Sequence, residues 1–337
     1  MKIDVFNHIF PPPFFERLQR VTINRGAIKR WLNIPFLHDV DVRFRRLEEF
    51  GDEYRQILSL SAPPIEAINP DRQITIDLAR LANDSQAELV RRFPDRFPGF
   101  VASLPLNHPD DSVIELTRAV RELGAVGVQI FSNVNGLPLD DDRFFPLLET
   151  AARLRCPVLL HPARGAGVPD YATETKSKYE IWWTFGWPYE TSAAMQRLVF
   201  SRVLDRLPDL RVVAHHLGAM IPYFEGRVGY GLDQFGARTA DEDYEGLRRS
   251  MPRRPIDYFK TFWADTAVFG SRAATECGLQ FFGEDQVVFA SDAPFDPEGG
   301  PMYIRETIKV IDSLDITPAA RGKIYRGNAE RLFNRTF

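Results

Sequence analysis

The segment Pro157-Val158-Leu159-Leu160-His161 consists of apolar residues that end at a histidine. A short run that is apolar on both faces is typical of a parallel strand covered by helices. Seven other short runs in the chain have the same character and are also predicted to be strands. They are Ile3–Phe6, Gln56–Leu60, Gly99–Ser103, Val126–Ile130, Arg211–His215, Thr261–Asp265 and Val287–Ser291.

The segments between these strands carry the amphipathic patterns of helices. The clearest are Ile74–Arg92, Asp110–Leu123, Thr191–Leu207, Tyr303–Leu314 and Pro318–Phe333. Eight strands that alternate with helices favour a (β/α)8 TIM barrel formed by residues 1–337 as one domain. The alternative is a doubly wound parallel sheet, but no glycine-rich fingerprint follows the first strand to support it.

The composition restricts the class of protein and the kind of site. The 337 residues carry 42 Lys and Arg against 46 Asp and Glu, a formal net charge of −4, which argues against a nucleic-acid-binding protein. The two cysteines, Cys156 and Cys277, are too few for a cysteine zinc cluster or a disulfide framework. Any metal must therefore be held by histidine and carboxylate side chains. With no signal peptide or membrane-spanning run visible, we expect a cytoplasmic protein without a membrane partner.

Two segments are longer than ordinary loops. Residues 162–190 follow the fifth strand and contain the aromatic residues Trp182, Trp183, Phe185 and Trp187. Residues 236–255 precede the seventh strand and are rich in charge. Since the loops after the strands build the active-site face of a barrel, the first insertion is a candidate lid or pocket wall. Trp183 and Trp187 are then candidates for substrate contact, with packing over the barrel or in a subunit interface as the alternative.

Ionisable side chains gather where the predicted strands end. His8 comes just after strand one, His161 ends strand five, His215 and His216 end strand six, and Asp292 follows strand eight. Carboxyl ends of barrel strands share one rim, so these side chains are expected to lie close together. His8, His161 and Asp292 would supply two imidazoles and a carboxylate, a set suited to Zn²⁺, Mn²⁺ or Fe²⁺.

Three further polar residues near strand ends admit two interpretations each. Arg164 is placed to bind a substrate carboxylate, or to form a structural ion pair. Asp265 is placed to orient a metal ligand, or to cap the following helix. Glu190 is a candidate for the site, or simply an acidic residue at the start of a helix.

The chain resembles the amidohydrolase-2 family, which includes aminocarboxymuconate semialdehyde decarboxylase and γ-resorcylate decarboxylase. The resemblance spans nearly the whole sequence. Its motifs are Met1–Pro11, Leu159-Leu160-His161-Pro162, the stretch His215–Tyr223, Ala290–Phe295 and the terminal Gly327–Phe333. The resemblance implies a metal-dependent barrel in which His216 is a catalytic acid or base near the metal. It also implies that the neighbouring His215 is turned away from the site, with recruitment of His215 to the site as the alternative.

The first strand departs from the family pattern. The family carries His-x-His or Glu-x-His there, whereas this chain has Phe6-Asn7-His8. A phenyl ring cannot bind a metal, so the expected set falls from four ligands to His8, His161 and Asp292. We expect Zn²⁺, with Mn²⁺ or Fe²⁺ as alternatives, and the loss at Phe6 also allows weak binding or none.

The resemblance implies a carbon–carbon lyase that removes CO₂ without oxidation from a small aromatic or conjugated carboxylic acid. His216 and Asp292 are the expected catalytic residues. The same groups would also serve a hydrolase or hydratase acting on a lactone, an amide or an unsaturated acid. A third hypothesis is a catalytically reduced subunit that pairs with an active homologue. A homodimer is the expected assembly, with such a hetero-oligomer as the alternative.

Overall fold

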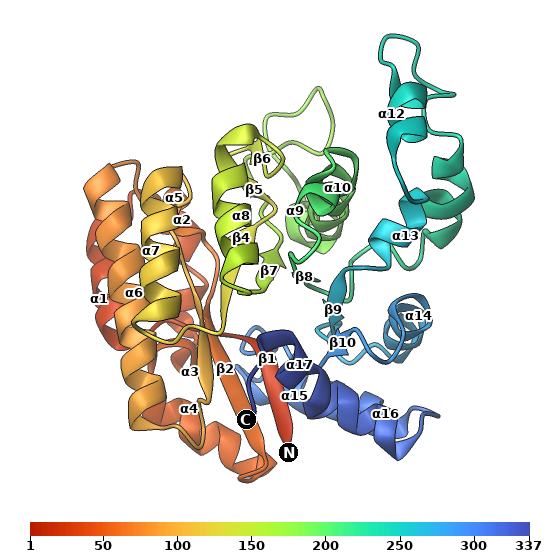
Figure 1. The fold of residues 1–337 in the computed structure, drawn as a ribbon. Coiled ribbons are helices and arrows are strands. Elements are labelled where there is room, and N and C mark those ends of the chain that lie inside the picture. Colours follow the sequence, from red (N-terminus) through yellow and green to blue (C-terminus); the bar gives the residue numbers. More distant parts are fainter.

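The computed structural model describes residues 1–337, with the side chain of Ala27 set aside. Its main sheet has eight parallel strands in the order β1, β2, β3, β4, β7, β8, β9, β10. Their bounds are Lys2–Ile9, Tyr54–Leu60, Gly99–Ala102, Gly127–Phe131, Val158–His161, Val212–Ala214, Trp263–Asp265 and Val287–Val288. All eight lie at the runs that the sequence predicts, although several are shorter (Figure 1).

The sheet curls so that its last strand meets its first. The segment after β10 bonds to β1 through backbone N–H groups: Val5 donates to Phe289 O at 3.0 Å, and His8 donates to Ala293 O at 2.8 Å. Asp292 in turn donates its N–H to Phe6 O at 3.0 Å. These bonds bring the two ends of the sheet together, and the prediction of a (β/α)8 barrel is confirmed.

Helices follow most strands and cover the outside of the sheet (Figure 1). They are α1 Pro12–Val21, α2 Arg25–Ile28, α3 Pro35–His38, α4 Val40–Leu47, α5 Ile65–Ile68, α6 Arg72–Arg92, α7 Pro109–Arg121, α8 Phe145–Arg153, α9 Ile181–Thr184, α10 Gly186–Phe200, α11 Val203–Arg206, α12 Tyr244–Ser250, α13 Pro255–Phe259, α14 Arg272–Phe282, α15 Pro301–Ser313, α16 Pro318–Gly322 and α17 Asn328–Phe333.

Short 3-10 turns at 31–33, 48–50 and 142–144, and π-helical turns at 227–231 and 323–327, complete the helical structure. The helix predicted over Thr191–Leu207 is divided in two, because Arg202 adopts a left-handed conformation (φ 63°) between α10 and α11.

The apolar side chains pack on both faces of the sheet. One buried cluster joins the outer faces of the strands to the helices. A second joins inner strand residues, among them Ile57, Leu159 and Val213, to Leu332 and Phe333 of α17. Burial of each such side chain contributes on the order of 2 kcal/mol to stability. The barrel is therefore a packed core, and its polar residues gather at the carboxyl ends of the strands.

The long segments contain structure of their own. Residues 162–190 include α9 and lead into α10, while 236–255 include α12, which projects beyond the barrel in Figure 1. A hairpin of β5 (Asn133–Val134) and β6 (Leu137–Pro138) follows β4 and was not predicted. Its Asn135-Gly136 turn has positive φ at both residues, a recognisable hairpin signal. Among the described residues, no helix is both long and apolar enough to cross a bilayer.

Candidate metal centre

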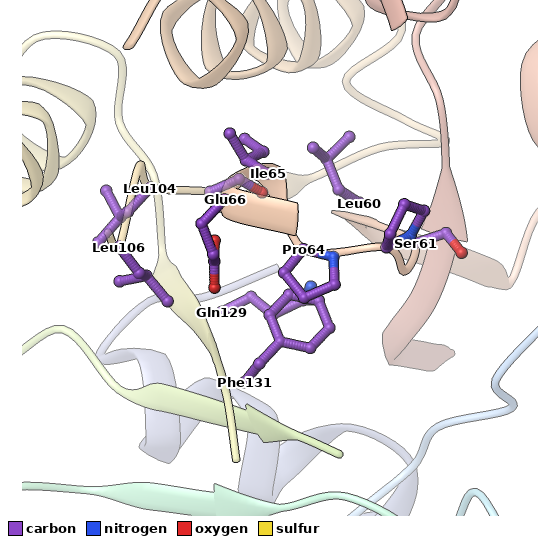
Figure 2. Close-up of a pocket in the computed structure, with 11 residues that line it drawn as sticks. Leu60, Ser61, Pro64, Ile65, Glu66, Leu104, Leu106, Gln129 and Phe131 are labelled. Carbon is purple, nitrogen blue, oxygen red and sulfur yellow. The ribbon is translucent and has the colours of Figure 1, made fainter. Parts of the chain in front are cut away.

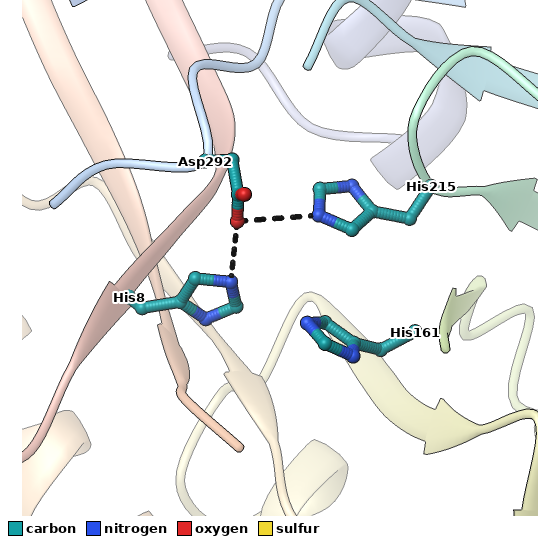
Figure 3. A group of neighbouring side chains, drawn as sticks. All are labelled: His8, His161, His215 and Asp292. Atoms are coloured by element: carbon teal, nitrogen blue, oxygen red, sulfur yellow. Dashed lines mark hydrogen bonds and ion pairs between the residues drawn. The ribbon is translucent and has the colours of Figure 1, made fainter. Parts of the chain in front are cut away.

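Four buried side chains meet at the carboxyl ends of the strands. His8 lies on β1 and His161 ends β7, while His215 follows β8 directly and Asp292 lies in the segment after β10. Each offers one ligand atom, and these atoms all lie within 4.8 Å of one another. Figure 3 shows the four side chains directed at a common centre.

The three imidazoles are oriented by acceptors behind them. His8 Nδ1 donates to Leu60 O at 2.9 Å, and His161 Nδ1 donates to Pro162 O at 2.7 Å. His215 Nδ1 donates to a carboxylate oxygen of Asp265 at 2.5 Å. With an Nδ1 proton directed at each of these acceptors, the Nε2 of each ring is the atom that can bind a metal ion in the centre once it carries no proton.

The fourth member brings negative charge to the same point. Asp292 Oδ1 lies 3.0 Å from His8 Nε2 and 3.3 Å from His215 Nε2. Burial alone would raise the pKa of Asp292, but its contacts with the histidines hold it well below the usual range, so the group is ionised. Three imidazole nitrogens and one carboxylate oxygen are a donor set that fits a divalent transition metal.

The pKa values of the histidine rings depend on burial and on the neighbouring charged groups. Burial and the neighbouring His215 and His8 lower the pKa of His161 well below its usual range, so this ring is neutral. Burial acts in the same direction on His215, but Asp265 and Asp292 outweigh it and raise the pKa of that ring to about 9. A positive charge is thus favoured between the two carboxylates, and a metal ion would supply it in place of the proton.

Phe6 does not reduce the group to three residues. That expectation is not supported, because His215 stands in the group, and the idea that His215 turns away is wrong. The Phe6 ring is 1% exposed and packs edge-on against the His215 ring, with 4.0 Å between centroids. Phe6 forms an apolar wall of the centre. The fourth candidate ligand is His215, which directly follows β8, instead of a second residue of β1.

His216 lies beside the group rather than within it. Its Nε2 is 3.6 Å from Asp292 Oδ2, and its Nδ1 has no hydrogen-bond partner among the described residues. The backbone of His216 is left-handed (φ 56°), which is uncommon for a residue other than glycine. This conformation directs the adjacent side chains of His215 and His216 to different positions. Asp265 Oδ1 accepts the His216 N–H at 3.1 Å, so Asp265 holds both histidines.

The other predicted residues lie at different distances from the group. Trp187 packs edge-on against His161, 5.6 Å between centroids, and its indole N–H donates to Arg164 O at 3.1 Å. Arg164 pairs with Glu190 at 3.4 Å and donates to Pro169 O at 3.1 Å. Trp183, on the short helix α9, donates to Glu180, the residue just before that helix, at 2.7 Å. Arg164 and Glu190 thus bind each other, and Trp187 is the tryptophan that reaches the histidines.

The sequence interpretation missed a group of residues near His8 and Asp292. Phe295 lies 5.4 Å from the His8 ring, and the Arg30 guanidinium lies 5.3 Å from Phe295 while donating to its carbonyl at 2.6 Å. Tyr303 contacts Phe269, and burial together with the charge of Asp292 raises the pKa of its hydroxyl. Phe295 lies only three residues after Asp292 and could have been considered from that spacing, but Arg30 comes from a long segment without a strand-end signal.

Comparison with known proteins agrees with this geometry. Residues 67–335 match the family model described as amidohydrolase. The chain is 35% identical to γ-resorcylate decarboxylase of Rhodococcus jostii (strain RHA1), with 87% of each chain covered. It is 33% identical to 2-amino-3-carboxymuconate-6-semialdehyde decarboxylase of Dictyostelium discoideum, covering 86% of this chain and 75% of that protein.

Solved structures that resemble this chain include some with a bound metal. The crystal structure of dihydroxybenzoic acid decarboxylase from Polaromonas sp. JS666, with bound manganese and the inhibitor 2-nitroresorcinol, superimposes with a TM-score of 0.79. The two chains are 28% identical, and the match covers 99% of this chain and 96% of that one.

Proposed function

The chain belongs to the amidohydrolase family, and we propose that it is a metal-dependent carbon–carbon lyase. Its reaction would be the non-oxidative decarboxylation of a small aromatic or conjugated carboxylic acid. The relatives whose names describe decarboxylases of such acids support this choice.

One observation carries the proposal. His8, His161 and His215 each donate Nδ1–H to a fixed acceptor, and each directs Nε2 toward the Asp292 carboxylate. In the absence of a cation, a proton on His215 balances the Asp292 charge, and a divalent ion held by the three imidazoles and the carboxylate would take the place of that proton. That arrangement is stable when a cation lies between them.

The donor set indicates which metal to expect. Three nitrogens and one oxygen, with room for a further ligand, suit Zn²⁺, and we propose Zn²⁺ as the resident ion. Mn²⁺ is the alternative suggested by the Polaromonas structure, and Fe²⁺ is a further one. When bound, the ion would bind an oxygen of the substrate and stabilise negative charge as CO₂ leaves.

His216 is the proposed proton carrier. Burial and the neighbouring His215 lower the pKa of His216, so its ring is neutral at neutral pH and is able to accept a proton. In the reaction the bond between the ring carbon and the carboxylate breaks, CO₂ departs, and the electron pair stays on the carbon. His216 would deliver a proton, drawn from solvent or a substrate hydroxyl, to that carbon.

Aromatic walls and one arginine would orient the substrate. Trp187 packs beside His161 and Phe295 beside His8, and their aromatic rings would contact a flat substrate ring. A guanidinium has five N–H donors, and Phe295 O uses one of those on Arg30, so Arg30 is better placed than Arg164 to bind a substrate carboxylate. Arg164, held by Glu190, would instead fix the start of α10, which carries Trp187.

We also propose that the protein is a homodimer. Several large side chains in and near residues 162–190 are strongly exposed, notably Tyr171, Tyr179, Phe185 and Tyr189 at 72%, 90%, 73% and 57%. A concentration of exposed aromatic rings is typical of an interaction surface.

The central experiment measures the reaction and the metal together. Protein stripped with a chelator is reloaded with Zn²⁺, Mn²⁺ or Fe²⁺ and incubated with a panel of hydroxybenzoic and conjugated acids, and CO₂ release is recorded. We expect release that depends on the metal. Loss of substrate without CO₂ would instead indicate a hydratase or hydrolase. Inactive, metal-poor protein that co-purifies with a related barrel would indicate the catalytically reduced subunit.

A further inference from the structure

Two cavities of very different size lie near opposite ends of β2. The smaller lies at the carboxyl end, and its volume of about 10 Å³ is roughly what one water molecule needs (Figure 2). The larger is a cleft at the amino end with a volume of about 520 Å³, which is within the range of small-molecule sites. Of the two, the cleft is the one with room for an organic ligand.

The larger cavity, here called the arginine cleft, is formed by two segments of the chain. One is the turn before β2 together with the second residue of that strand, and the other is the end of α6 with the turn that follows it. The lining residues are Asp52, Arg55, Arg92, Phe93, Pro94, Asp95 and Arg96. None of them belongs to the metal centre.

The arginine cleft is remote from that centre. Arg55 lies near the start of β2, whereas Leu60 ends the strand and accepts the Nδ1–H of His8 through its carbonyl. A strand rises about 3.3 Å per residue, so Arg55 and Leu60 are roughly 16 Å apart along it. A ligand in the cleft therefore does not touch the reacting atoms, and its binding is separate from the decarboxylation proposed above.

The charges in the lining are only partly balanced by one another. Arg96 lies 3.0 Å from an oxygen of Asp52 and also donates to Gly51 O at 3.2 Å. That pair accounts for one charge of each sign. The guanidiniums of Arg55 and Arg92 are left, and within the lining they are opposed only by the carboxylate of Asp95, so the cleft carries an excess of positive charge.

Both remaining guanidiniums have donors available. Arg55 Nε is buried and makes no hydrogen bond among the described residues. A buried charged donor without an acceptor is costly, and an oxygen atom of a ligand would remove that cost. Arg92 is exposed, and its guanidinium lies over the Phe93 ring, 5.0 Å from the centroid. This contact uses the flat face of the guanidinium and leaves the N–H groups at its edge free to bind an anion.

We propose that the arginine cleft binds the phosphate group of a small phosphorylated molecule, with Arg55 and Arg92 as the residues that bind it. A phosphate monoester offers three terminal oxygens, enough for two guanidiniums, whereas a carboxylate offers two and is satisfied by one. The organic part of the molecule would lie against Phe93 and Pro94, the two uncharged side chains of the lining. The inference does not rest on the proposed function.

Calorimetry of the metal-loaded protein tests this site. The probes are inorganic phosphate, glucose 6-phosphate and glucose, measured in a buffer of low ionic strength because salt screens exposed charges. We expect both phosphate compounds to bind and glucose not to bind. Tighter binding of glucose 6-phosphate than of phosphate would identify an ester as the ligand, whereas equal affinities would identify the phosphate ion itself. CO₂ release is a separate measurement, and its absence would contradict only the proposed function.

Variants connect the binding to the cleft. In Arg55→Met and Arg92→Met, affinity for glucose 6-phosphate should fall about tenfold or more, while Arg55→Lys should lose less because it keeps the charge but not the paired donors. Asp95→Asn should strengthen binding by about threefold, because it removes the opposing carboxylate. The fold should tolerate these changes, since Arg92 is exposed and Arg55 Nε leaves no partner behind.

Arg121→Met is the matched control. Arg121 is exposed in the last turn of α7, as Arg92 is in the last turn of α6, but it does not line the cleft. Its substitution should leave the affinity for glucose 6-phosphate unchanged. The proposal is overturned if neither phosphate compound binds, or if Arg121→Met weakens binding as much as Arg92→Met. It is also overturned if binding survives in both Arg55→Met and Arg92→Met, since phosphate held by the metal ion would behave in that way.

Discussion

Two buried polar regions share strand β1, and they differ in how their charges are satisfied. The metal centre surrounds His8. The second region, here called the Arg43 network, consists of Asp4, Asn7, Arg43, Tyr54 and Gln56, all nearly inaccessible to solvent. Both regions are polar and both lie inside a largely apolar core.

The Arg43 network is complete in itself. Arg43 donates to Gln56 Oε1 at 2.8 Å, to Asn7 Oδ1 at 2.5 Å and to His8 O at 2.8 Å. Asp4 accepts hydrogen bonds from the Tyr54 hydroxyl and from the Ser291 hydroxyl and N–H. The Arg43 guanidinium therefore meets hydrogen-bond acceptors, and the Asp4 carboxylate meets hydrogen-bond donors, all supplied by the protein.

The metal centre has no such complement. Its potential metal-ligand atoms converge instead, since three imidazoles and one carboxylate each direct one of them to the same point. Burial alone therefore does not identify a functional group; what identifies it is the set of donors or acceptors left over after the protein has satisfied its own. The Arg43 network holds β1 in place, and the metal centre, to which β1 contributes His8, keeps ligand atoms available for a metal ion.

The largest expected effect is at the centre. Asp292→Ala removes the only carboxylate in the four-residue group, so we expect decarboxylation to fall by roughly 10⁴-fold, because both metal affinity and charge at the reacting carbon are affected. Metal content by mass spectrometry and CO₂ release together measure it. Asp285→Asn, at an exposed ion pair with Lys323, should change neither. An Asp292→Ala protein with full metal and activity would refute the assignment of the centre.

The next effect is on stability, in the Arg43 network. Arg43→Met leaves Gln56 Oε1, Asn7 Oδ1 and His8 O without their donor, and we expect a loss of about 3–5 kcal/mol in the free energy of unfolding. Denaturant unfolding measures it. Arg91→Met, which removes a solvent-exposed pair with Glu88, should leave the stability nearly unchanged. Equal effects of the two substitutions would show that the network is not structural.

Much of the fold could be predicted from sequence because hydrophobic patterns are local. The run Val158–His161 is apolar at every position before the histidine, and the parallel sheet requires that pattern. The break between α10 and α11 could not be predicted, because it depends on a left-handed residue, Arg202, that has no glycine to mark it. Single-residue conformations of this kind depend on tertiary contacts.

The site was predictable in position but not in composition. The strand ends placed His8, His161 and Asp292 at one rim, where the structure brings them together. The choice between His215 and His216 could not be made from spacing, because adjacent residues in a turn point wherever the backbone sends them. The positive φ of His216 and the hydrogen bond from His215 to Asp265 decide it, and neither is visible in the sequence.

A moderate effect is expected on the pH dependence of stability. Burial raises the pKa of Asp4 from 3.8 to about 6, against the opposing hydrogen bonds from Ser291 and Tyr54. The folded protein therefore binds this proton more tightly than the unfolded chain. Its contribution to stability is greatest below pH 3.8, falls as the pH rises to about 6, and is constant above, a total change on the order of 3 kcal/mol.

Denaturant unfolding of wild type and Asp4→Asn across this range measures that change. The stability of the wild-type protein relative to Asp4→Asn should fall by about the same amount as the pH rises through this window, since the amide does not titrate. Parallel pH profiles would show that Asp4 has the same proton affinity in the folded and unfolded chains.

The smallest expected effect is on the rate of metal release, and it concerns Phe6, which lies on β1 between Asp4 of the Arg43 network and His8 of the metal centre. Phe6 lies two residues from both Asp4 and His8, and its ring packs against His215. Phe6→His would place an imidazole beside the four candidate ligands, and we expect metal loss to excess chelator to become about tenfold slower. Release followed with a metal-sensitive dye measures the rate.

Phe6→Leu separates coordination from packing. It keeps the wall apolar but removes the ring, so it should release metal no more slowly than the wild-type protein. If Phe6→His also fails to slow release, four residues already satisfy the ion and the aromatic ring serves only to exclude water. If Phe6→His slows metal release and also lowers activity, the added imidazole occupies a coordination position that the substrate needs. The phenyl ring of Phe6 then contributes to function by leaving that position free.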